Sequence, residues 1–141
     1  FVRASLKKSV RNSDCAAKAL IDRQSGELIG ICTFTAYSLE KQRVSGVLQG
    51  SQPSEIGVVR LVMLGVARKY QKRGFGQDLL CDFFEHVKII HQALPIKGVY
   101  LDADPAAINF YARLGFVQLS ATPNAFGAVP MFLAIQHILA A

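Results

Sequence analysis

The sequence predicts one α/β (α+β) domain, because runs typical of buried strands are followed twice by helical patterns. Residues 56–66 (IGVVRLVMLGV) are rich in β-branched and aliphatic residues and predict a nearly buried strand. Apolar residues then recur at helical spacing, which predicts a helix that begins between Gly74 and Gly76 and buries a stripe made of Leu79, Leu80, Phe83, Phe84, Val87, Ile90 and Leu94. With 51% hydrophobic residues, a chain of 141 residues can bury a sizeable core.

The second strand and helix follow at residues 99–114. Residues 99–103 (VYLDA) predict a short strand, Pro105 is placed as a first-turn proline, and Gly115 is placed as the C-cap of a helix over 106–114. Residues 116–119 then resume extended structure.

Closer to the N-terminus, residues 2–11 predict the end of a helix and residues 16–21 a strand. A hairpin turn over 23–27 leads into a strand over 27–39, and residues 40–54 form a long loop.

The turn at residues 66–76 (VARKYQKRGFG) predicts an anion site. Free amide groups and the positive end of the helix dipole stabilise a bound phosphate there, by roughly 1 kcal/mol for the dipole alone. Gly74 and Gly76 let the backbone approach the ligand, while positive charge comes from Arg68, Lys69, Lys72 and Arg73. The expected ligand is a pyrophosphate, although the pattern is neither GxGxxG nor a Walker A loop. The alternative is a glycine-rich turn with no ligand.

Two motifs resemble those of the GCN5-related N-acetyltransferases (GNAT family). Residues 71–76 (QKRGFG) resemble the family's Gln/Arg-x-x-Gly-x-Gly/Ala loop, and residues 107–116 (AINFYARLGF) resemble its A-x-x-F-Y-x-x-x-G-F motif. The resemblance implies the GNAT fold, with a mixed central sheet and helices on both faces, and acetyl-coenzyme A as cosubstrate. Because the family places one strand and one or two helices before the hairpin, we expect residues 1–141 to be a GNAT domain whose N-terminal part is missing.

The resemblance also implies site residues. The loop that holds the pyrophosphate comprises Arg68, Gln71, Lys72, Arg73, Gly74, Phe75 and Gly76. Backbone groups of Leu64 and Val66 bind the pantetheine arm and polarise the acetyl carbonyl. Tyr111 is the general acid that protonates the coenzyme A thiolate, with a buried packing tyrosine as the alternative. Asn109 is a further cofactor contact if the start of its helix is irregular.

A general base is less evident. Glu55, at the entrance to the central strand, is a candidate, but it can equally be a solvated charge at the strand edge. An acceptor with an α-amino group, whose pKa is near 8, needs little help from a base, whereas a lysine acceptor needs more.

Over almost the whole chain, the layout resembles the tRNA-acetylating toxins of type II toxin–antitoxin modules, although only the two motif blocks are specific. This implies aminoacyl-tRNA as the acceptor, a block of translation, a ribbon-helix-helix antitoxin as partner, and a homodimer. The long loop over 40–54 is then expected over the acceptor entrance. Met63 stands where such toxins carry an arginine, and Arg60, three residues away, points to the opposite face of the strand.

The charge distribution supports a polyanionic acceptor. The net charge is +6, and basic residues cluster at the loop and near the start of the chain, at Arg3, Lys7, Lys8 and Arg11. A solvated surface helix is the alternative for the second cluster. Two other functions stay open, namely an ordinary acetyltransferase of a small-molecule or protein amine, and a non-catalytic module that keeps the cofactor loop.

Composition also bears on the setting and on metal or thiol chemistry. Without an apolar run of about 18 residues or a signal peptide, we expect a cytoplasmic protein that makes no use of a membrane. The histidines form no metal pattern. The three cysteines have no CxxC spacing, and Cys81, beside Leu80, is expected to pack rather than react.

Overall fold

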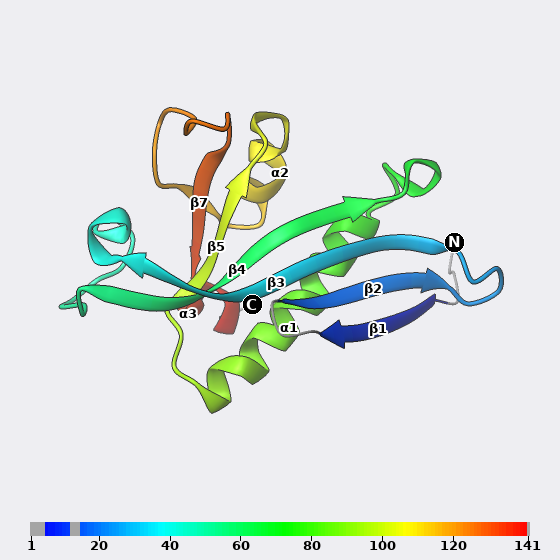
Figure 1. The fold of residues 1–141 in the computed structure, drawn as a ribbon, viewed down its shortest axis with the longest axis horizontal. Coiled ribbons are helices and arrows are strands. Elements are labelled where there is room, and N and C mark those ends of the chain that lie inside the picture. The colour runs from blue at the N-terminus through cyan, green and yellow to red at the C-terminus, as the bar shows by residue number, and fades with distance from the viewer. Residues whose placement is uncertain (1–4, 12–14, 141) are drawn as a thin grey trace. The chain divides into compact units, whose positions relative to one another are not determined.

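The structure, a computed structural model, describes residues 5–11 and 15–140 (Figure 1). Its strands are β1 (Ser5–Arg11), β2 (Ala16–Asp22), β3 (Leu28–Glu40), β4 (Glu55–Val66), β5 (Gly98–Ala103), β6 (Val117–Gln118) and β7 (Val129–Ala134). Its helices are α1 (Phe75–Ala93), α2 (Ile108–Arg113) and α3 (Ile135–Leu139), with 3-10 turns η1 (Lys41–Val44), η2 (Arg68–Tyr70) and η3 (Pro105–Ala107). The helices are too short or too polar to cross a membrane, as far as the described residues extend.

The strands follow the hydrogen-bonded order β1-β2-β3-β4-β5-β7-β6. β4 and β5 pair in parallel through Val59 with Val99 and Arg60 with Tyr100. The pairs β1–β2, β2–β3, β5–β7 and β6–β7 are antiparallel. The sheet is therefore mixed, as the family resemblance of the two motifs implies.

The helix expected over residues 2–11 is wrong for the residues that the structure describes. Ser5–Arg11 form strand β1, which pairs with β2 from Ser5 opposite Asp22 to Arg11 opposite Ala16. A hairpin partner supplies hydrogen bonds that a single-sequence pattern does not reveal, and this tertiary pairing overrides local preference. β1 is also an edge strand, where lysine is common because its charge disfavours pairing with another chain. Residues 2–4 lie outside the described residues.

The other predicted elements are confirmed, mostly within one residue at each end. The hairpin turn after β2 is closed by two backbone bonds, from the Asp22 amide to the Glu27 carbonyl (2.9 Å) and from the Gly26 amide to the Asp22 carbonyl (2.8 Å). The expected loop over 40–54 contains the 3-10 turn η1. β7 and α3 lie after the last element that the sequence analysis predicts.

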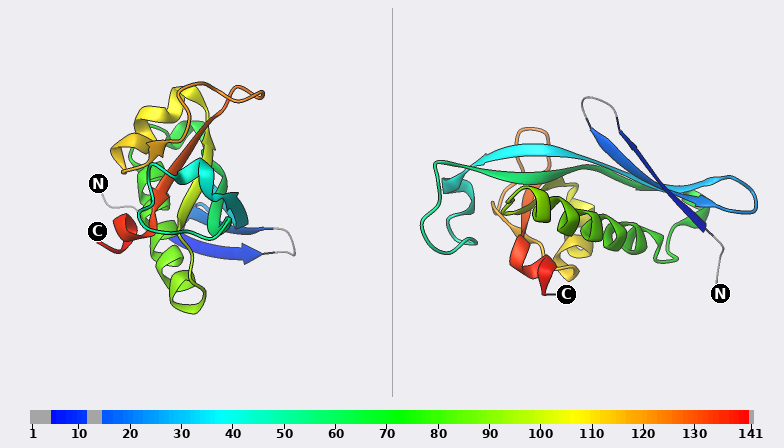
Figure 2. Two further views of the ribbon diagram at one scale, coloured as in Figure 1. Left: turned by 90° about the vertical axis from the view of Figure 1, so that its left-hand side faces the viewer. Right: turned by 90° about the horizontal axis from the view of Figure 1, so that it is seen from below.

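The chain divides into two compact units, the first made of Phe1–Thr35 and Leu61–Ile89 and the second of Ala36–Arg60 and Ile90–Ala141. In the first unit, α1 packs along β2 and the first part of β3 (Figure 2). The rings of Phe34 and Phe83 lie 5.0 Å apart, and Lys18 on β2 pairs with Asp82 on α1 at 3.2 Å. The predicted stripe is buried at Leu79, Leu80, Phe83 and Val87. Leu94 does not belong to it, because the helix ends at Ala93 and Leu94 is 65% exposed.

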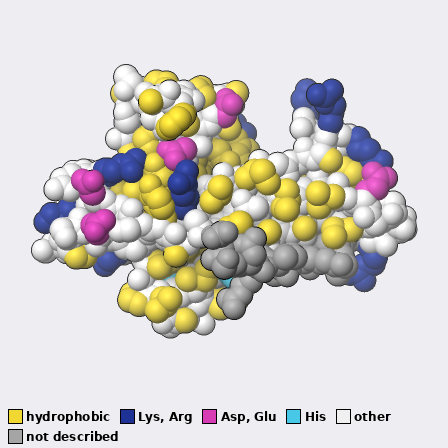
Figure 3. Space-filling model, viewed as in Figure 1, with side chains coloured by type: hydrophobic (Ala, Val, Ile, Leu, Met, Phe, Trp, Pro, Cys, Tyr) yellow, Lys and Arg dark blue, Asp and Glu magenta, His cyan; other side chains and the backbone are white. Residues whose placement is uncertain are grey.

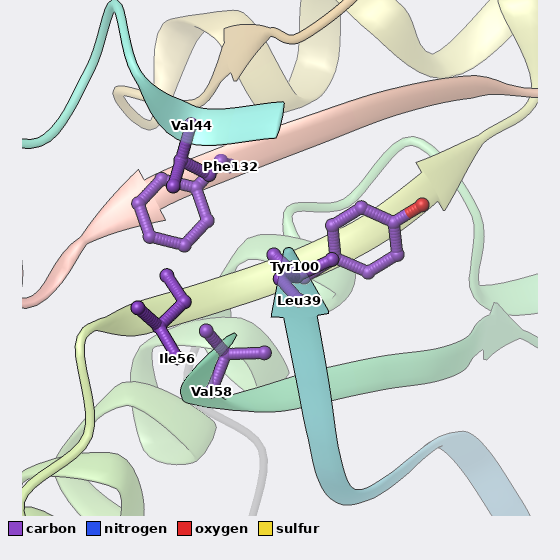
Figure 4. Packing of buried hydrophobic residues seen from close by; sticks show 6 residues of the cluster. All are labelled: Leu39, Val44, Ile56, Val58, Tyr100 and Phe132. Carbon is purple, nitrogen blue, oxygen red and sulfur yellow. The ribbon is translucent and has the colours of Figure 1, made fainter. Parts of the chain in front are cut away.

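In the second unit, a core forms between η1, the end of β3, the start of β4, and strands β5 and β7. Figure 4 shows its buried members, which are Leu39, Val44, Ile56, Val58, Tyr100 and Phe132. The phenyl ring of Phe132 is fully buried, so β7 contributes directly to this core. The long segment that precedes β4 is thus attached to the sheet through Val44.

Gly98 makes a testable contribution to this packing. A Cβ at Gly98 would collide with the Leu133 carbonyl oxygen and lie 2.6 Å from the Phe132 ring. Gly98→Ala is therefore expected to lower the free energy of unfolding by about 2 kcal/mol or more, as overpacked cores do. Chemical denaturation measures the change.

The matched control is Gly57→Ala on β4, where an added Cβ meets nothing within 4 Å. This variant should unfold within about 0.5 kcal/mol of the parent. Equal denaturant midpoints of unfolding for the two variants would show that β5 and β7 are not packed as closely as described.

Candidate functional site

The turn between β4 and α1 is held in shape by contacts within the first unit. The Ala67 amide donates to the Ile29 carbonyl at 2.8 Å, and the Gln71 side-chain amide donates to the Val66 carbonyl at 3.0 Å. Tyr70 is buried and meets the Phe75 ring edge-on, with the centroids 6.0 Å apart. The turn is therefore a defined structure and not a flexible linker. The predicted cofactor residue Gln71 contributes to it by closing the loop.

The backbone of this turn enters the left-handed region twice. Lys72 has φ of 64° and Gly74 has φ of 82°, and the left-handed region is uncommon for a residue such as lysine. The bond from the Asp78 amide to the Gly74 carbonyl (3.0 Å) spans the first turn of α1, so the amides of residues 75–77 precede the intrahelical ladder. Amide groups at a helix start are suited to bind a phosphate, and so are successive amides in a turn whose residues alternate between right-handed and left-handed backbone conformations.

Positive charge gathers on the same turn, as the dark blue side chains after β4 show in Figure 3. Its four cationic residues, Arg68, Lys69, Lys72 and Arg73, are all exposed. The Tyr70 ring has the Lys69 ammonium 5.3 Å from its centroid and the Arg73 guanidinium 5.9 Å away. Lys69 also pairs with Glu27 at 2.8 Å, which offsets its charge. The charge offered to an anion therefore comes chiefly from Arg68, Lys72 and Arg73.

The structure places Leu64 and Val66 in the first unit, at the end of β4 that leads into the turn. Both residues are half-buried, whereas the side chain of Met63, which precedes Leu64 on β4, is 47% exposed. Phe75 and Gly76 open α1 and are half-buried. The predicted cofactor residues from Leu64 to Gly76 therefore lie on one continuous strand, turn and helix start.

Tyr111 and Asn109 belong to the second unit and are described there. The Asp104 carboxylate caps η3 by accepting from the Ala106 amide at 2.9 Å, and α2 follows directly. Tyr111 is 9% exposed, and its ring meets those of Phe110 and Phe116 at 5.2 and 5.6 Å. Asn109 is exposed, as expected for residues two apart on a helix, which point about 200° away from each other.

A comparison with protein families tests the resemblance that these motifs suggest. Residues 17–118 match the family described as Acetyltransferase (GNAT) domain. This chain belongs to the GNAT acetyltransferase family. The expected GNAT fold and the N-acetyltransferase class are thereby confirmed. No curated protein sequence matches the chain.

Solved structures resemble this acetyltransferase over most of its length. One described as a bacterial toxin is 76% identical, has a TM-score of 0.95, and aligns over 99% of this chain and 95% of its own. The complex of KacTA with DNA is 22% identical with a TM-score of 0.74, over 92% of this chain and 74% of that one. AtaT complexed with acetyl-methionyl-tRNAfMet is also 22% identical, with a TM-score of 0.75 over 92% and 76% of the two chains. At these lower identities, the likeness shows the fold alone.

The structure also contains a polar cluster that the sequence analysis of this acetyltransferase missed. We call it the Asp102 cluster, and it consists of Tyr37, Arg43, Arg60, Tyr100 and Asp102, all in the second unit. The Tyr100 hydroxyl donates to Asp102 Oδ1 at 2.7 Å, and Arg60 Nη2 donates to Asp102 Oδ2 at 3.2 Å. Arg43 Nη2 donates to the Tyr100 hydroxyl oxygen at 2.8 Å. The alternation of Tyr100 and Asp102 along β5 is a signal that they share a face. The arginines come from 57 and 42 residues away, so no local pattern predicts them.

Glu55, the candidate general base, is exposed and accepts a bond from the Ser38 hydroxyl at 3.2 Å. Its role stays a prediction. Among the described residues, no group of three or more His, Cys, Asp or Glu side chains is placed to hold a metal ion.

The expectation that Cys81 packs in the core is wrong. Cys81 lies on the outer face of α1 and is exposed, because the helix buries its neighbours Leu79, Leu80 and Phe83 instead. Cys32 is the buried thiol, and burial raises its pKa to about 11.

These two thiols should differ in reactivity. At pH 8 in the native protein, a thiol reagent is expected to modify Cys81 within minutes and to leave Cys32 unmodified, because the thiolate is the reactive form. Mass spectrometry of peptides identifies the labelled residue. In Cys81→Ser the peptide that contains Cys32 should stay unlabelled, and rapid modification of Cys32 in that variant would contradict its burial.

Proposed function

We propose that this acetyltransferase is a toxin that transfers the acetyl group of acetyl-coenzyme A to the α-amino group of aminoacyl-tRNA and thereby blocks translation. The observation that carries the proposal is the 76% identity, over nearly the full length of both chains, to a solved bacterial toxin. The net charge of +6 supports a polyanionic acceptor.

In this proposal the turn after β4 binds the coenzyme. The amides of residues 75–77 and the side chains of Arg68, Lys72 and Arg73 hold its pyrophosphate, and Gly74 gives it room. Leu64 and Val66 offer backbone groups to the pantetheine arm. AtaTR, a structural relative, has been solved bound with acetyl-coenzyme A, which supports this choice of cosubstrate.

The chemistry then needs an attacking amine and a proton for the leaving thiolate. The neutral α-amine forms a bond to the acetyl carbon as the carbon–sulfur bond breaks, and the nitrogen loses one proton to water. The Tyr111 hydroxyl donates its proton to the thiolate and regains one from water. Packing of Tyr111 between Phe110 and Phe116 holds the ring in one orientation and supports this assignment.

The proposal includes a protein partner. We propose a ribbon-helix-helix antitoxin as the partner of this chain, and a homodimer as its assembly. Support comes from AtaT bound to the C-terminus of the antitoxin AtaR and from the complex of KacTA with DNA.

The deciding experiment follows labelled acetyl from acetyl-coenzyme A into bulk aminoacyl-tRNA, with deacylated tRNA and a panel of free amines beside it. Label in charged tRNA alone is the expected result, and the modified amino acid reveals the specificity. Label only in a small amine would make the protein an ordinary acetyltransferase. Coenzyme binding with no transfer to any acceptor would leave it a binding module.

A further inference from the structure

The Asp102 cluster reaches solvent through its three charged members. Arg43 is exposed, and the side chains of Asp102 and Arg60 are 23% and 33% exposed, whereas Tyr100 is only 2% exposed and belongs to the core. Arg60 Nε is buried and has no hydrogen-bond acceptor among the described residues, so it is the Nη end of the guanidinium that pairs with Asp102. The partly exposed side of the cluster therefore contains the Asp102 carboxylate and the Arg60 guanidinium.

The rest of the cluster holds these two groups in place. The Tyr37 and Tyr100 rings are stacked, with centroids 5.4 Å apart and planes 16° from parallel, and the Arg60 guanidinium lies 5.1 Å from the Tyr37 centroid. Burial, together with the bond to Asp102, raises the pKa of Tyr100, so its hydroxyl stays protonated and donates to the carboxylate. Each Asp102 oxygen thus accepts one bond from the protein, and further lone pairs face solvent.

This arrangement is preorganised for a ligand with a donor and an acceptor close together. Asp102 Oδ2 and Arg60 Nη2 are 3.2 Å apart, so the carboxylate offers a hydrogen-bond acceptor directly beside the donors of the guanidinium. An α-amino ester carries N–H groups and a carbonyl on adjacent carbon atoms, which matches this pair. The amine of a lysine side chain or an alkylamine has no carbonyl beside it.

The charges of the cluster disfavour a polycationic acceptor. Two guanidinium groups, those of Arg43 and Arg60, outnumber the one carboxylate of Asp102, so a polyamine would bring additional cations against the same arginines. The proposed α-amine brings a single nitrogen, which faces the carboxylate and attacks the thioester in its neutral form.

We propose that Asp102 and Arg60 recognise the aminoacyl group of the acceptor, with Asp102 accepting a hydrogen bond from the α-amine and Arg60 donating one to the ester carbonyl. This inference rests on the proposed function and names which part of the acceptor is recognised. Tyr100 and Arg43 are positioning residues, since they act through Asp102.

The test compares Asp102→Asn and Arg60→Lys with the parent for acetylation of charged tRNA, using labelled acetyl-coenzyme A. Both variants should lower kcat/KM for charged tRNA by roughly 10- to 100-fold, the effect of losing a charged hydrogen bond. Acetyl-coenzyme A affinity, measured by calorimetry, should stay within about twofold, because the cluster belongs to acceptor recognition in this proposal. Glu85→Gln on α1 is the control, since it neutralises a carboxylate that is 67% exposed and takes no part in the proposed sites, and it should keep the parental kcat/KM.

A second pair of substrates separates recognition from a merely structural role. The parent should acetylate a methionine methyl ester faster than an n-alkylamine, and both variants should reduce that ratio. Unchanged kcat/KM for charged tRNA, or an unchanged ratio of ester to alkylamine acetylation rates, would overturn the inference.

If the parent fails to label charged tRNA, the proposed function fails. The ratio of ester to alkylamine acetylation rates, measured for the parent and the variants, then still decides the role of the cluster. Should Asp102→Asn not fold, Arg60→Lys, which keeps a cation beside Asp102, carries the comparison alone.

Discussion

Replacement of Gly74 by aspartate is expected to abolish acetyl-coenzyme A binding, with a loss of affinity of at least about a hundredfold. Two effects act in the same direction. Gly74 has φ of 82°, a conformation that residues with a Cβ rarely adopt, so the substituted turn is strained. The new carboxylate also adds negative charge where the turn is proposed to hold a pyrophosphate. Calorimetric titration with acetyl-coenzyme A measures the affinity.

The control for Gly74→Asp is Gly50→Asp. Gly50 has φ of 79° and lies in the loop before β4, with nothing within 4 Å of an added Cβ, so it receives the same backbone strain and the same charge. This variant should bind the coenzyme like the parent. Unchanged affinity in Gly74→Asp would remove the turn after β4 from the coenzyme site.

Replacement of Tyr111 by phenylalanine is expected to lower turnover by about a hundredfold and to leave acetyl-coenzyme A affinity unchanged. The ring packs edge-on against Phe110 and Phe116, and a phenylalanine keeps both contacts. Only the hydroxyl is lost, and with it the proton proposed for the thiolate. Steady-state kinetics with the acceptor identified by the labelling experiment measures kcat.

Two further measurements on Tyr111→Phe distinguish a chemical role from a structural one. Its melting temperature and its coenzyme affinity should match those of the parent, since the core contacts persist. Normal turnover would mean that water or another group supplies the proton. A reduced melting temperature with proportionally reduced activity would return Tyr111 to its alternative role as a packing residue.

Several elements could be predicted from the sequence because their signals are local. The apolar stripe of α1 and the β-branched run of β4 each lie within one short stretch of chain. Likewise, Gly26 marks the turn after β2 and Gly115 the end of α2. The same holds for the coenzyme turn, whose glycines and cations are contiguous. Its candidate residues were therefore found without knowledge of the fold, although their contact with the coenzyme stays a prediction.

Other features depend on partners that are distant in sequence. Ser5–Arg11 became a strand because β2 pairs with it, and Cys81 became exposed because of the direction in which α1 faces its sheet. Lys72 has φ of 64° in a turn that is closed by the bond from the Gln71 side chain to the Val66 carbonyl and by the buried Tyr70 ring. Patterns of a single segment contain none of this information.

By itself, the sequence determined the family's two motifs, the order of most elements and the chemical character of the coenzyme turn, because each of these is written in residues that are close along the chain. Only the tertiary structure decided that Tyr100 and Arg60 both donate hydrogen bonds to Asp102, and that Arg43 donates one to the Tyr100 hydroxyl oxygen. The physical reason is that hydrogen bonds and burial depend on distance in space, and the sheet brings together residues that the chain keeps 42 and 57 positions apart.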